Sequence, residues 1–218
     1  MLLPAAGHGV RLGRGPKALL ELQGRSLLAW LGAGVAGSTA ELLVAAPAGL
    51  EAEFRDRLPA HARVLAGGAT RQETVHLLAK AANAPLVVVH DAARPFLPRT
   101  VFDRAVEAAA ADGAATAAMP VSDTLIRRED GGQVNRDGLL AVQTPQAFRR
   151  DLLLAAHERA LHDRSEATDD AALVRRLGHR VSVVAGSPWL LKLTHPGDFK
   201  LAERLAAAWP ESGVFDAD

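Results

Sequence analysis

The hydrophobic residues of this chain fall into short apolar runs that alternate with longer amphipathic stretches. Four runs have strand length and end in Pro, Gly or a charged residue, at 42–46, 63–66, 86–90 and 114–119. Helical spacing predicts helices between them, at 25–35, 50–57, 70–82 and 99–111. One face of the third helix carries Val75, Leu78, Ala79 and Ala82. This alternation predicts a Rossmann-like α/β fold, with a doubly wound, mostly parallel sheet covered on both faces.

The pattern changes after Pro120, where the residues become polar and rich in turn formers. Residues 124–128 and 133–136 read as two strands joined by a turn at 129–132, which predicts a protruding β-arm at about 121–140. Because a two-stranded ribbon is marginal alone, the arm is either an exposed hairpin or a dimerisation element. Beyond Phe148 the pattern predicts helices at 150–162, 169–177 and 196–208 and strands at 180–185 and 190–194. We find no linker, so a single domain over 1–218 is expected.

Composition narrows the classes of partner. Hydrophobic residues make up 49% and charged residues 23%, as in a globular chain, whereas aromatics make up 4% with no Tyr, which leaves little for stacking on bases. Lys plus Arg and Asp plus Glu both total 25, so neither nucleic acid nor a membrane is an expected partner, and any anion site must be local.

With no Cys, disulfides and thiolate chemistry are excluded. No signal peptide or apolar span is evident, and we expect a soluble cytoplasmic protein.

A glycine-rich segment follows the first short apolar run. Residues 4–17 read PAAGHGVRLGRGPK. Only Met1 to Leu3 precede it, so the first strand is either abbreviated or begins upstream. Glycines let backbone amides approach an oxyanion, Arg11 offers a forked donor and Lys17 a point charge, a combination suited to a polyphosphate. The glycine spacing is one residue too long for the dinucleotide fingerprint, and no GK[ST] closes a P-loop.

Other motifs follow predicted strands, where ligands of open α/β sheets bind. Residues 67–75 (GGATRQETV) supply another glycine pair, with Arg71 and Thr74 also interpretable as solvated helix positions. Residues 86–96 (LVVVHDAARPF) place Asp91 at the end of an apolar strand, where it could hold Mg²⁺ or a ribose hydroxyl, or cap a turn or pair with Arg94. Lys192, in a predicted apolar strand, needs an anionic partner.

Taken together, the motifs resemble one family. PAAGHGVRLGRGPK, GGATRQETV, HDAARPF, VSDT, VQTPQAF, TDDA and LKLTHPGD occur in this order over nearly the whole chain. The chain thereby resembles the 2-C-methyl-D-erythritol 4-phosphate cytidylyltransferases of the non-mevalonate isoprenoid pathway. The resemblance implies that CTP and the sugar-alcohol phosphate give 4-diphosphocytidyl-2-C-methyl-D-erythritol and pyrophosphate. It also implies Mg²⁺ as cofactor and a homodimer whose arms reach across.

The resemblance assigns roles to residues of this sequence. Catalysis would fall to Arg11, Lys17 and Lys192. The nucleotide would be bound by Pro4, Ala5, Ala6, Gly7, Gly9, Gly68, Ala69, Thr74, Asp91 and Ala92, and Asp91 would also hold the metal. The sugar phosphate would be bound by Arg94, Thr124, Arg136, Thr144 and Thr168. Thr124 and Arg136 belong to the arm and would serve the partner's site.

The chain departs from the family pattern at Ala18, Ala69, Thr74 and Leu140, where the family usually has Gln, an acidic residue, Ser and Trp. These differences affect expected base contacts and packing. Three alternatives stay open at this stage. The chain could be a cytidylyltransferase for a pentitol phosphate such as ribitol 5-phosphate, or a guanylyl- or uridylyltransferase for sugars. It could also be a CTP-binding module without turnover.

Overall fold

A mostly parallel sheet forms the centre of the computed structural model, which describes residues 1–7 and 15–209. In these residues the sheet has seven strands in the order β11-β7-β10-β6-β1-β4-β5. β10 is antiparallel to both neighbours, and the other pairs are parallel. The strands are β1 (Leu2–Pro4), β4 (Leu43–Ala46), β5 (Arg63–Ala66), β6 (Leu86–Val89), β7 (Ala114–Pro120), β10 (Leu140–Arg149) and β11 (Ser182–Ala185). The predicted α/β fold is confirmed.

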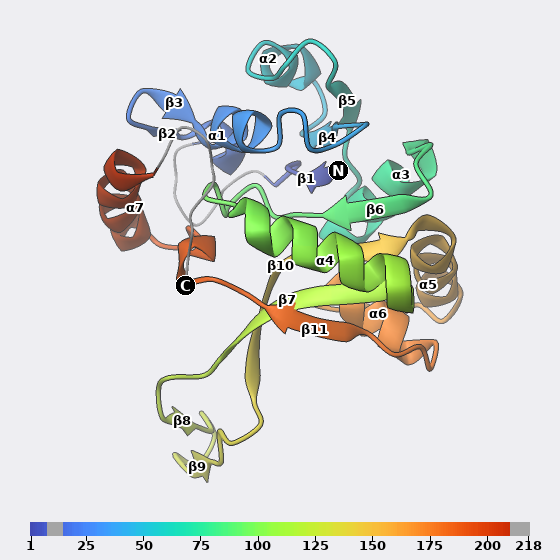
Figure 1. The fold of residues 1–218 in the computed structure, drawn as a ribbon, viewed down its shortest axis with the longest axis vertical. Coiled ribbons are helices and arrows are strands. Elements are labelled where there is room, and N and C mark those ends of the chain that lie inside the picture. Colours follow the sequence, from blue (N-terminus) through green and yellow to red (C-terminus); the bar gives the residue numbers. More distant parts are fainter. Residues whose placement is uncertain (8–14, 210–218) are drawn as a thin grey trace.

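Helices cover both faces of the sheet (Figure 1). One hydrophobic cluster joins one face to α1 (Leu27–Gly34), α2 (Glu51–Arg55) and α4 (Arg99–Asp112). A second cluster joins the opposite face to α3 (Arg71–Ala81), α5 (Arg150–His162) and α6 (Asp170–Arg176). The ends of these helices lie within two residues of the expected bounds.

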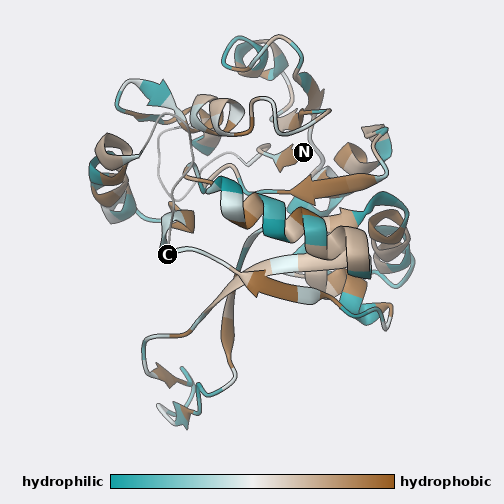
Figure 2. Ribbon diagram, viewed as in Figure 1, coloured by the Kyte–Doolittle hydropathy of each residue, from teal (hydrophilic) through white to brown (hydrophobic). Residues whose placement is uncertain are grey.

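The strands are apolar at consecutive positions because both faces of the sheet are buried. Successive strand residues point to opposite faces. Leu2 accordingly packs in the cluster of α3, α5 and α6, and Leu3 packs in the cluster of α1, α2 and α4, with both side chains fully buried. Figure 2 shows this as brown on strands such as β6 and β11, whereas the helices carry both teal and brown segments. Because both faces of the sheet are buried, the sheet forms the core of the molecule.

Helix α3 shows how local sequence sets an element that borders the site. Thr70 precedes the helix in an extended conformation, and its hydroxyl accepts a hydrogen bond from the Glu73 amide. The predicted apolar face is buried, with Val75 and Leu78 at 0% exposure. The cap and the apolar stripe together hold the first turn of α3 at the edge of the sheet.

The predicted strand at 190–194 is wrong. Pro188–Leu190 instead forms a short 3-10 helix, η3, and the following residues are extended without a strand partner in the described chain. Leu193 donates its amide to the Ala93 carbonyl and packs against Phe96 in a third cluster. That cluster also includes residues of α7 (Pro196–Ala208) and Leu22 of β2 (Glu21–Leu22), which forms a hairpin with β3 (Arg25–Ser26). The apolar side chains thus serve a separate small core rather than the sheet.

Strand β10 was not predicted as a strand, and it is the longest of the sheet. It inserts antiparallel between β6 and β7. Its pairing with β7 shifts register between Val142 and Gln146, around Pro145. A proline has no amide to donate to the ladder, so a break at this point is expected.

The predicted arm is present as the small hairpin of β8 (Leu125–Ile126) and β9 (Gln133–Val134), which projects from the ends of β7 and β10 (Figure 1). Its residues are mostly exposed, and the side chain of Ile126 is 65% exposed. The arm therefore has little core of its own.

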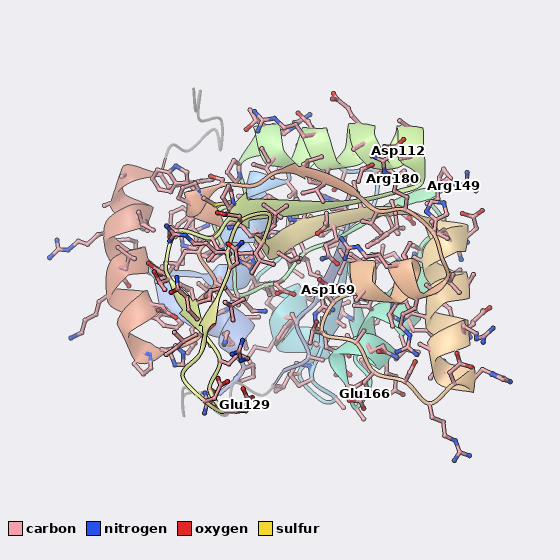
Figure 3. All side chains as sticks on the ribbon, turned by 90° about the horizontal axis from the view of Figure 1, so that it is seen from below. Asp112, Glu129, Arg149, Glu166, Asp169 and Arg180 are labelled. Carbon is pink, nitrogen blue, oxygen red and sulfur yellow. The ribbon has the colours of Figure 1, made fainter. Side chains whose placement is uncertain are left out.

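Charged side chains occupy the periphery in Figure 3, where Asp112, Arg149 and Arg180 lie near the end of α4. These residues flank the beginnings of β7 and β11. The opposite edge, where β1, β5 and β6 end, is the edge at which such sheets bind ligands. Among the helices of the described chain, none has the length and apolar character needed to cross a membrane.

Candidate active site

A cleft of about 550 Å³ opens at the carboxyl ends of β1, β5 and β6. It brings together residues that the sequence predicted for the nucleotide and for catalysis, which are Pro4, Ala5, Ala6, Gly7, Lys17, Gly68, Ala69, Thr74, Asp91, Ala92 and Lys192. Ala18, Thr70, Arg71 and Ala93 also line it. The predicted Gly9 and Arg11 lie outside the described residues.

Two backbone loops meet at the floor of the cleft. The Ala5 amide donates to Ala45 and the Gly67 amide donates to Ala46, so both loops are anchored on β4. A Cβ atom added to Gly67 would lie 2.2 Å from the Cβ of Ala6, far inside van der Waals contact. Glycine at position 67 is thus what lets the two loops approach.

The loop after Gly67 is held by its own hydrogen bonds. Gly68 donates its amide to Oγ1 of Thr74 at 3.1 Å, and Ala69 donates to Oε2 of Glu73 at 2.8 Å. Thr74 is 2% exposed and also donates to the Thr70 carbonyl at 2.8 Å. The interpretation of Thr74 as a solvated helix residue is therefore wrong, because its hydroxyl shapes the cleft loop.

Two lysines approach the cleft from opposite ends of the chain. Lys17 begins the 3-10 helix η2 (Lys17–Leu19), and its Nζ donates to the Leu193 carbonyl at 2.8 Å. Lys192 is the residue before Leu193, and its Nζ lies 2.6 Å from Oδ2 of Asp91. Lys192 thus has an anionic partner, as its position required, although it does not lie in a strand.

Asp91 follows β6 and is the carboxylate of this cleft. Its side chain is 12% exposed, and its amide donates to Oγ1 of Thr144 at 3.1 Å. Burial raises the pKa of Asp91, but the charges of Arg71 and Lys192 outweigh burial and hold that pKa well below its usual range. The carboxylate is ionised at neutral pH and sits between two cations.

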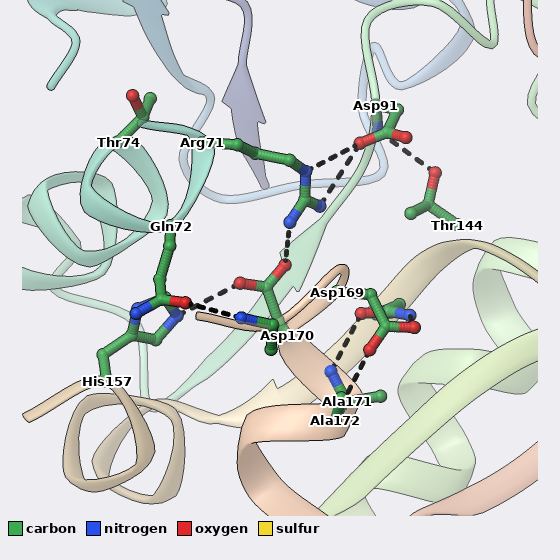
Figure 4. A network of polar contacts seen from close by, with 12 residues as sticks. Arg71, Gln72, Thr74, Asp91, Thr144, His157, Asp169, Asp170, Ala171 and Ala172 are labelled. Carbon is green, nitrogen blue, oxygen red and sulfur yellow. Dashed lines mark hydrogen bonds and ion pairs between the residues drawn. The ribbon is translucent and has the colours of Figure 1, made fainter. Parts of the chain in front are cut away.

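Sequence reasoning missed Arg71, which is not a solvated helix residue. Its Nε lies 3.3 Å from Oδ1 of Asp91, and its Nη1 lies 2.9 Å from Oδ2 of Asp170 (Figure 4). A signal was available, because a cation in the first turn of a helix opposes the helix dipole and calls for nearby carboxylates. The partners themselves lie too far along the sequence for local patterns to reveal.

The residues predicted for the sugar phosphate do not line this cleft. Arg94 donates to the Leu190 carbonyl, and burial lowers its pKa. Thr144 lies buried behind Asp91, and Thr168 is exposed before α6. The arm residues Thr124 and Arg136 are exposed, with Arg136 donating to the Ser122 carbonyl within the arm.

The two ammonium groups of Lys17 and Lys192, beside the ionised carboxylate of Asp91, suit a ligand that carries several phosphates. Their position at the strand ends of a doubly wound sheet defines the chain as a nucleotide-binding α/β enzyme.

Comparisons with known proteins give the particular family. The family model described as IspD, 2-C-methyl-D-erythritol 4-phosphate cytidylyltransferase, matches residues 1–207. Proteins named 2-C-methyl-D-erythritol 4-phosphate cytidylyltransferase from Deinococcus radiodurans and Thermus thermophilus are 53% and 48% identical to the chain. The first alignment covers 94% of this chain and 88% of the relative, and the second covers 96% and 97%. A crystal structure of the enzyme from Thermus thermophilus superposes with a TM-score of 0.84 at 46% identity, covering 94% of this chain and 97% of that one.

The chain belongs to the 2-C-methyl-D-erythritol 4-phosphate cytidylyltransferase family. It is a nucleotidyltransferase of the non-mevalonate isoprenoid pathway. It transfers the cytidylyl group of CTP to 2-C-methyl-D-erythritol 4-phosphate, and pyrophosphate leaves. These findings favour methylerythritol phosphate over the pentitol phosphate and over a binding module without turnover.

Proposed function

We propose that Lys17 and Lys192 are the catalytic cations of this reaction and that the cleft binds CTP beside the first loop. The observation that carries the proposal is the convergence of the two lysines, since Lys17 donates to the residue that follows Lys192 at 2.8 Å. The loops at 4–7 and 68–69 would hold the nucleoside, with Thr74 and Ala92 completing its pocket. The family resemblance adds Gly9 as a binder of the nucleotide and Arg11 as a third catalytic cation, which would clamp the triphosphate.

The proposed chemistry needs cations and alignment rather than a general base. A phosphate monoester is largely dianionic at neutral pH because its second pKa is about 6. An oxygen of that phosphate forms a bond to the α-phosphorus of CTP, while the bond from the α-phosphorus to the pyrophosphate oxygen breaks. Both reactants are anionic, so their repulsion opposes contact, and Lys17 and Lys192 would lower it and stabilise charge on the α-phosphoryl oxygens.

We propose that Mg²⁺ enters this cleft together with the nucleotide. Among the described residues, no group of three or more His, Cys, Asp or Glu side chains is arranged to hold a metal alone. Asp91 supplies one carboxylate at the cleft, and Mg²⁺ is commonly held by one or two carboxylates plus substrate phosphates. We therefore assign Mg²⁺ to Asp91 and the nucleotide. When bound there, the ion would neutralise negative charge on the phosphate oxygens.

The sugar phosphate and the arm form the second part of the proposal. Thr124 and Arg136 are exposed on the arm, away from the cleft of their own chain. Apolar side chains at the base and tip of the arm are also exposed, with Val142 at 41% and Ile126 at 65%. We propose a homodimer in which each arm covers the partner's cleft, and Thr124 and Arg136 bind the sugar phosphate there. Arg94, Thr144 and Thr168 would support the same substrate from the body of the chain.

The cellular location expected from the sequence is part of the proposal. A chain with no Cys fits a reducing compartment. We propose that the enzyme works in the cytoplasm, which fractionation of cells producing the native protein would test.

The catalytic assignment is tested by replacing Lys17. Lys17→Ala should lower the rate of pyrophosphate release by roughly 10²- to 10³-fold, by analogy with the loss of one oxyanion donor. Lys200→Ala, at an exposed position on α7, is the matched control and should stay near the wild-type rate. Near-normal turnover and unchanged CTP affinity in Lys17→Ala would refute the assignment.

A further inference from the structure

A line of paired side chains runs from the cleft into the protein. Lys192 contacts Asp91, Asp91 contacts Arg71, and Arg71 contacts Asp170 at distances of 2.6, 3.2 and 2.9 Å. The line ends at His157, whose Nε2 lies 3.1 Å from Oδ1 of Asp170. Figure 4 shows Arg71 between the two carboxylates. Each carboxylate thus has a partner on either side.

Asp170 is the buried anchor of this line. Its side chain is 1% exposed, as is that of His157, whereas the side chain of Arg71 is 33% exposed. A buried carboxylate is costly unless it is paired and hydrogen-bonded. Asp170 therefore holds the guanidinium of Arg71 from the inside, while Arg71 reaches the cleft.

The fork of Arg71 spans both carboxylates at once. Nη1 faces Asp170, whereas Nε and Nη2 face Oδ1 of Asp91 at 3.3 and 3.2 Å. A guanidinium has a planar set of donors suited to this arrangement, and an ammonium is a single point charge. Because all three nitrogen atoms face carboxylates, the geometry favours orientation of Asp91 over direct binding of a phosphate.

Hydrogen bonds of the neighbouring Gln72 hold the start of α3, which carries Arg71, against the segment before α6. Gln72 donates to the Ser165 carbonyl at 3.1 Å and accepts from the Ala167 amide at 3.1 Å. These bonds tie the start of α3 to the segment that leads into α6, where Asp170 is the first helical residue. Asp169 caps α6 by accepting from the Ala172 amide at 2.7 Å. The two helix starts are thereby locked together, with Arg71 and Asp170 between them.

We propose that Arg71 is a positioning residue for cytidylyl transfer, holding the Asp91 carboxylate at the cleft while Asp170 anchors Arg71. The inference rests on the role proposed for Asp91. Without Arg71, Asp91 keeps Lys192 as its remaining charged partner among the pairs described. The carboxylate would then turn toward Lys192 and hold that cation away from the phosphates.

Kinetics of Arg71→Gln, Asp170→Asn and the double variant test the proposal. Arg71→Gln should lower kcat by roughly 10- to 100-fold, with KM for CTP within about threefold, because orientation is lost rather than a binding contact. Asp170→Asn should lower kcat less, and the double variant should match Arg71→Gln, because Asp170 acts through Arg71. Arg71→Lys should recover part of kcat, since an ammonium keeps the charge without spanning both carboxylates.

Calorimetric CTP affinity and melting temperature supply readouts besides turnover. Arg63→Gln is the matched control, because Arg63 pairs with Glu41 at 3.6 Å at the start of β5, away from the cleft. It should leave kcat unchanged. If Asp170→Asn does not fold, the comparison of Arg71→Gln with Arg71→Lys decides the proposal.

Three results would overturn it. One is a fall in CTP affinity of Arg71→Gln that accounts for its whole loss of activity, which would make Arg71 a direct nucleotide ligand. Another is a lower melting temperature with unchanged kcat, which would make it structural. The third is normal turnover in Arg71→Gln while Asp91→Asn is inactive. This result would show that the reaction needs Asp91 but that Arg71 does not position it. Full activity of Asp91→Asn would instead refute the role of Asp91.

Discussion

Lys192 places its Nζ 2.6 Å from Oδ2 of Asp91, a residue 101 positions earlier in the chain. The side chain of Lys192 is 46% exposed, whereas that of Asp91 is 12% exposed. A phosphate entering the cleft can therefore reach the ammonium of Lys192 and compete with Asp91 for it. This ion pair links the segment before α7 to the end of β6.

Replacement of Lys192 should affect turnover more than nucleotide binding. Lys192→Met keeps the length of the side chain and removes its charge, so kcat should fall by roughly 10²-fold if the cation stabilises the transition state. Steady-state kinetics with CTP varied would measure this. Lys200→Met is the control, and an unchanged kcat in Lys192→Met would show that its pair with Asp91 is structural.

Gly67→Ala should separate the two cleft loops. The added Cβ would lie 2.2 Å from the Cβ of Ala6, so the backbone must shift, at a cost of about 1–3 kcal/mol of unfolding free energy. CTP affinity should fall with it. Urea unfolding and calorimetric titration would measure the two effects.

Gly34→Ala is the matched control for that substitution. Within the described part of the chain, and apart from the neighbouring backbone of its own helix, no atom lies within 4 Å of a Cβ added at Gly34, the last residue of α1. Its free energy of unfolding should stay within about 1 kcal/mol of wild type or rise. Equal stability and equal CTP affinity in both variants would mean that the close approach of the loops is unimportant.

His90 should make the fold less stable in mild acid. Burial lowers the pKa of His90 to about 4, and its Nε2 lies 2.9 Å from the Arg94 carbonyl. In the unfolded chain the pKa is about 6.5, so between these values the unfolded state binds the extra proton. The free energy of unfolding should therefore decrease as pH falls from about 6.5 toward 4, by up to about 1.4 kcal/mol per pH unit.

The contribution of His90 is isolated by comparison with His90→Gln, whose amide can still donate to the same carbonyl. The difference between the two stability curves should grow in that pH range. Parallel curves would show that other groups cause the acid sensitivity.

Mixed dimers should reveal the proposed exchange of arms. Lys17→Ala damages the cleft of its own chain, whereas Arg136→Ala would damage the cleft of its partner. After unfolding and refolding together, random pairing should restore about a quarter of the sites. Pyrophosphate release by the mixture, compared with each variant alone, would measure this.

Lys17→Ala mixed with Lys192→Ala is the control, because both substitutions then lie in the body of the chain and no cleft is complete. It should stay inactive. Failure of the Lys17→Ala and Arg136→Ala mixture to gain activity would argue against shared sites.

The sequence alone predicted those parts of the fold that depend on interactions between residues close together in the chain. The cap at Thr70 and the apolar face of α3 lie within a dozen residues, and the strand ends carrying Gly68 and Asp91 follow from consecutive apolar runs. These patterns predict where the cleft lies and many of the residues that line it. The apolar residues around Lys192 indicated that it needs an anionic partner, but no local pattern could show that this partner is Asp91.

Other features depend on contacts between distant segments. The segment at 190–194 is apolar because it packs against Phe96 and α7, not because it joins the sheet. β10 pairs with β6 and β7, but it contains a proline. Because a proline within a run of residues argues against a central strand, the sequence did not predict one here. Arg71 reads as a surface residue until Asp170, 99 positions later, is brought beside it.

CTP is proposed to bind beside the first loop, with its phosphates between Lys17 and Lys192. A crystal structure with CTP and Mg²⁺ tests it most directly. We predict cytidine against residues 4–7 and 68–69 and the α-phosphate within hydrogen-bonding distance of a lysine ammonium. Cytidine bound elsewhere, or phosphates turned away from both lysines, would contradict the account.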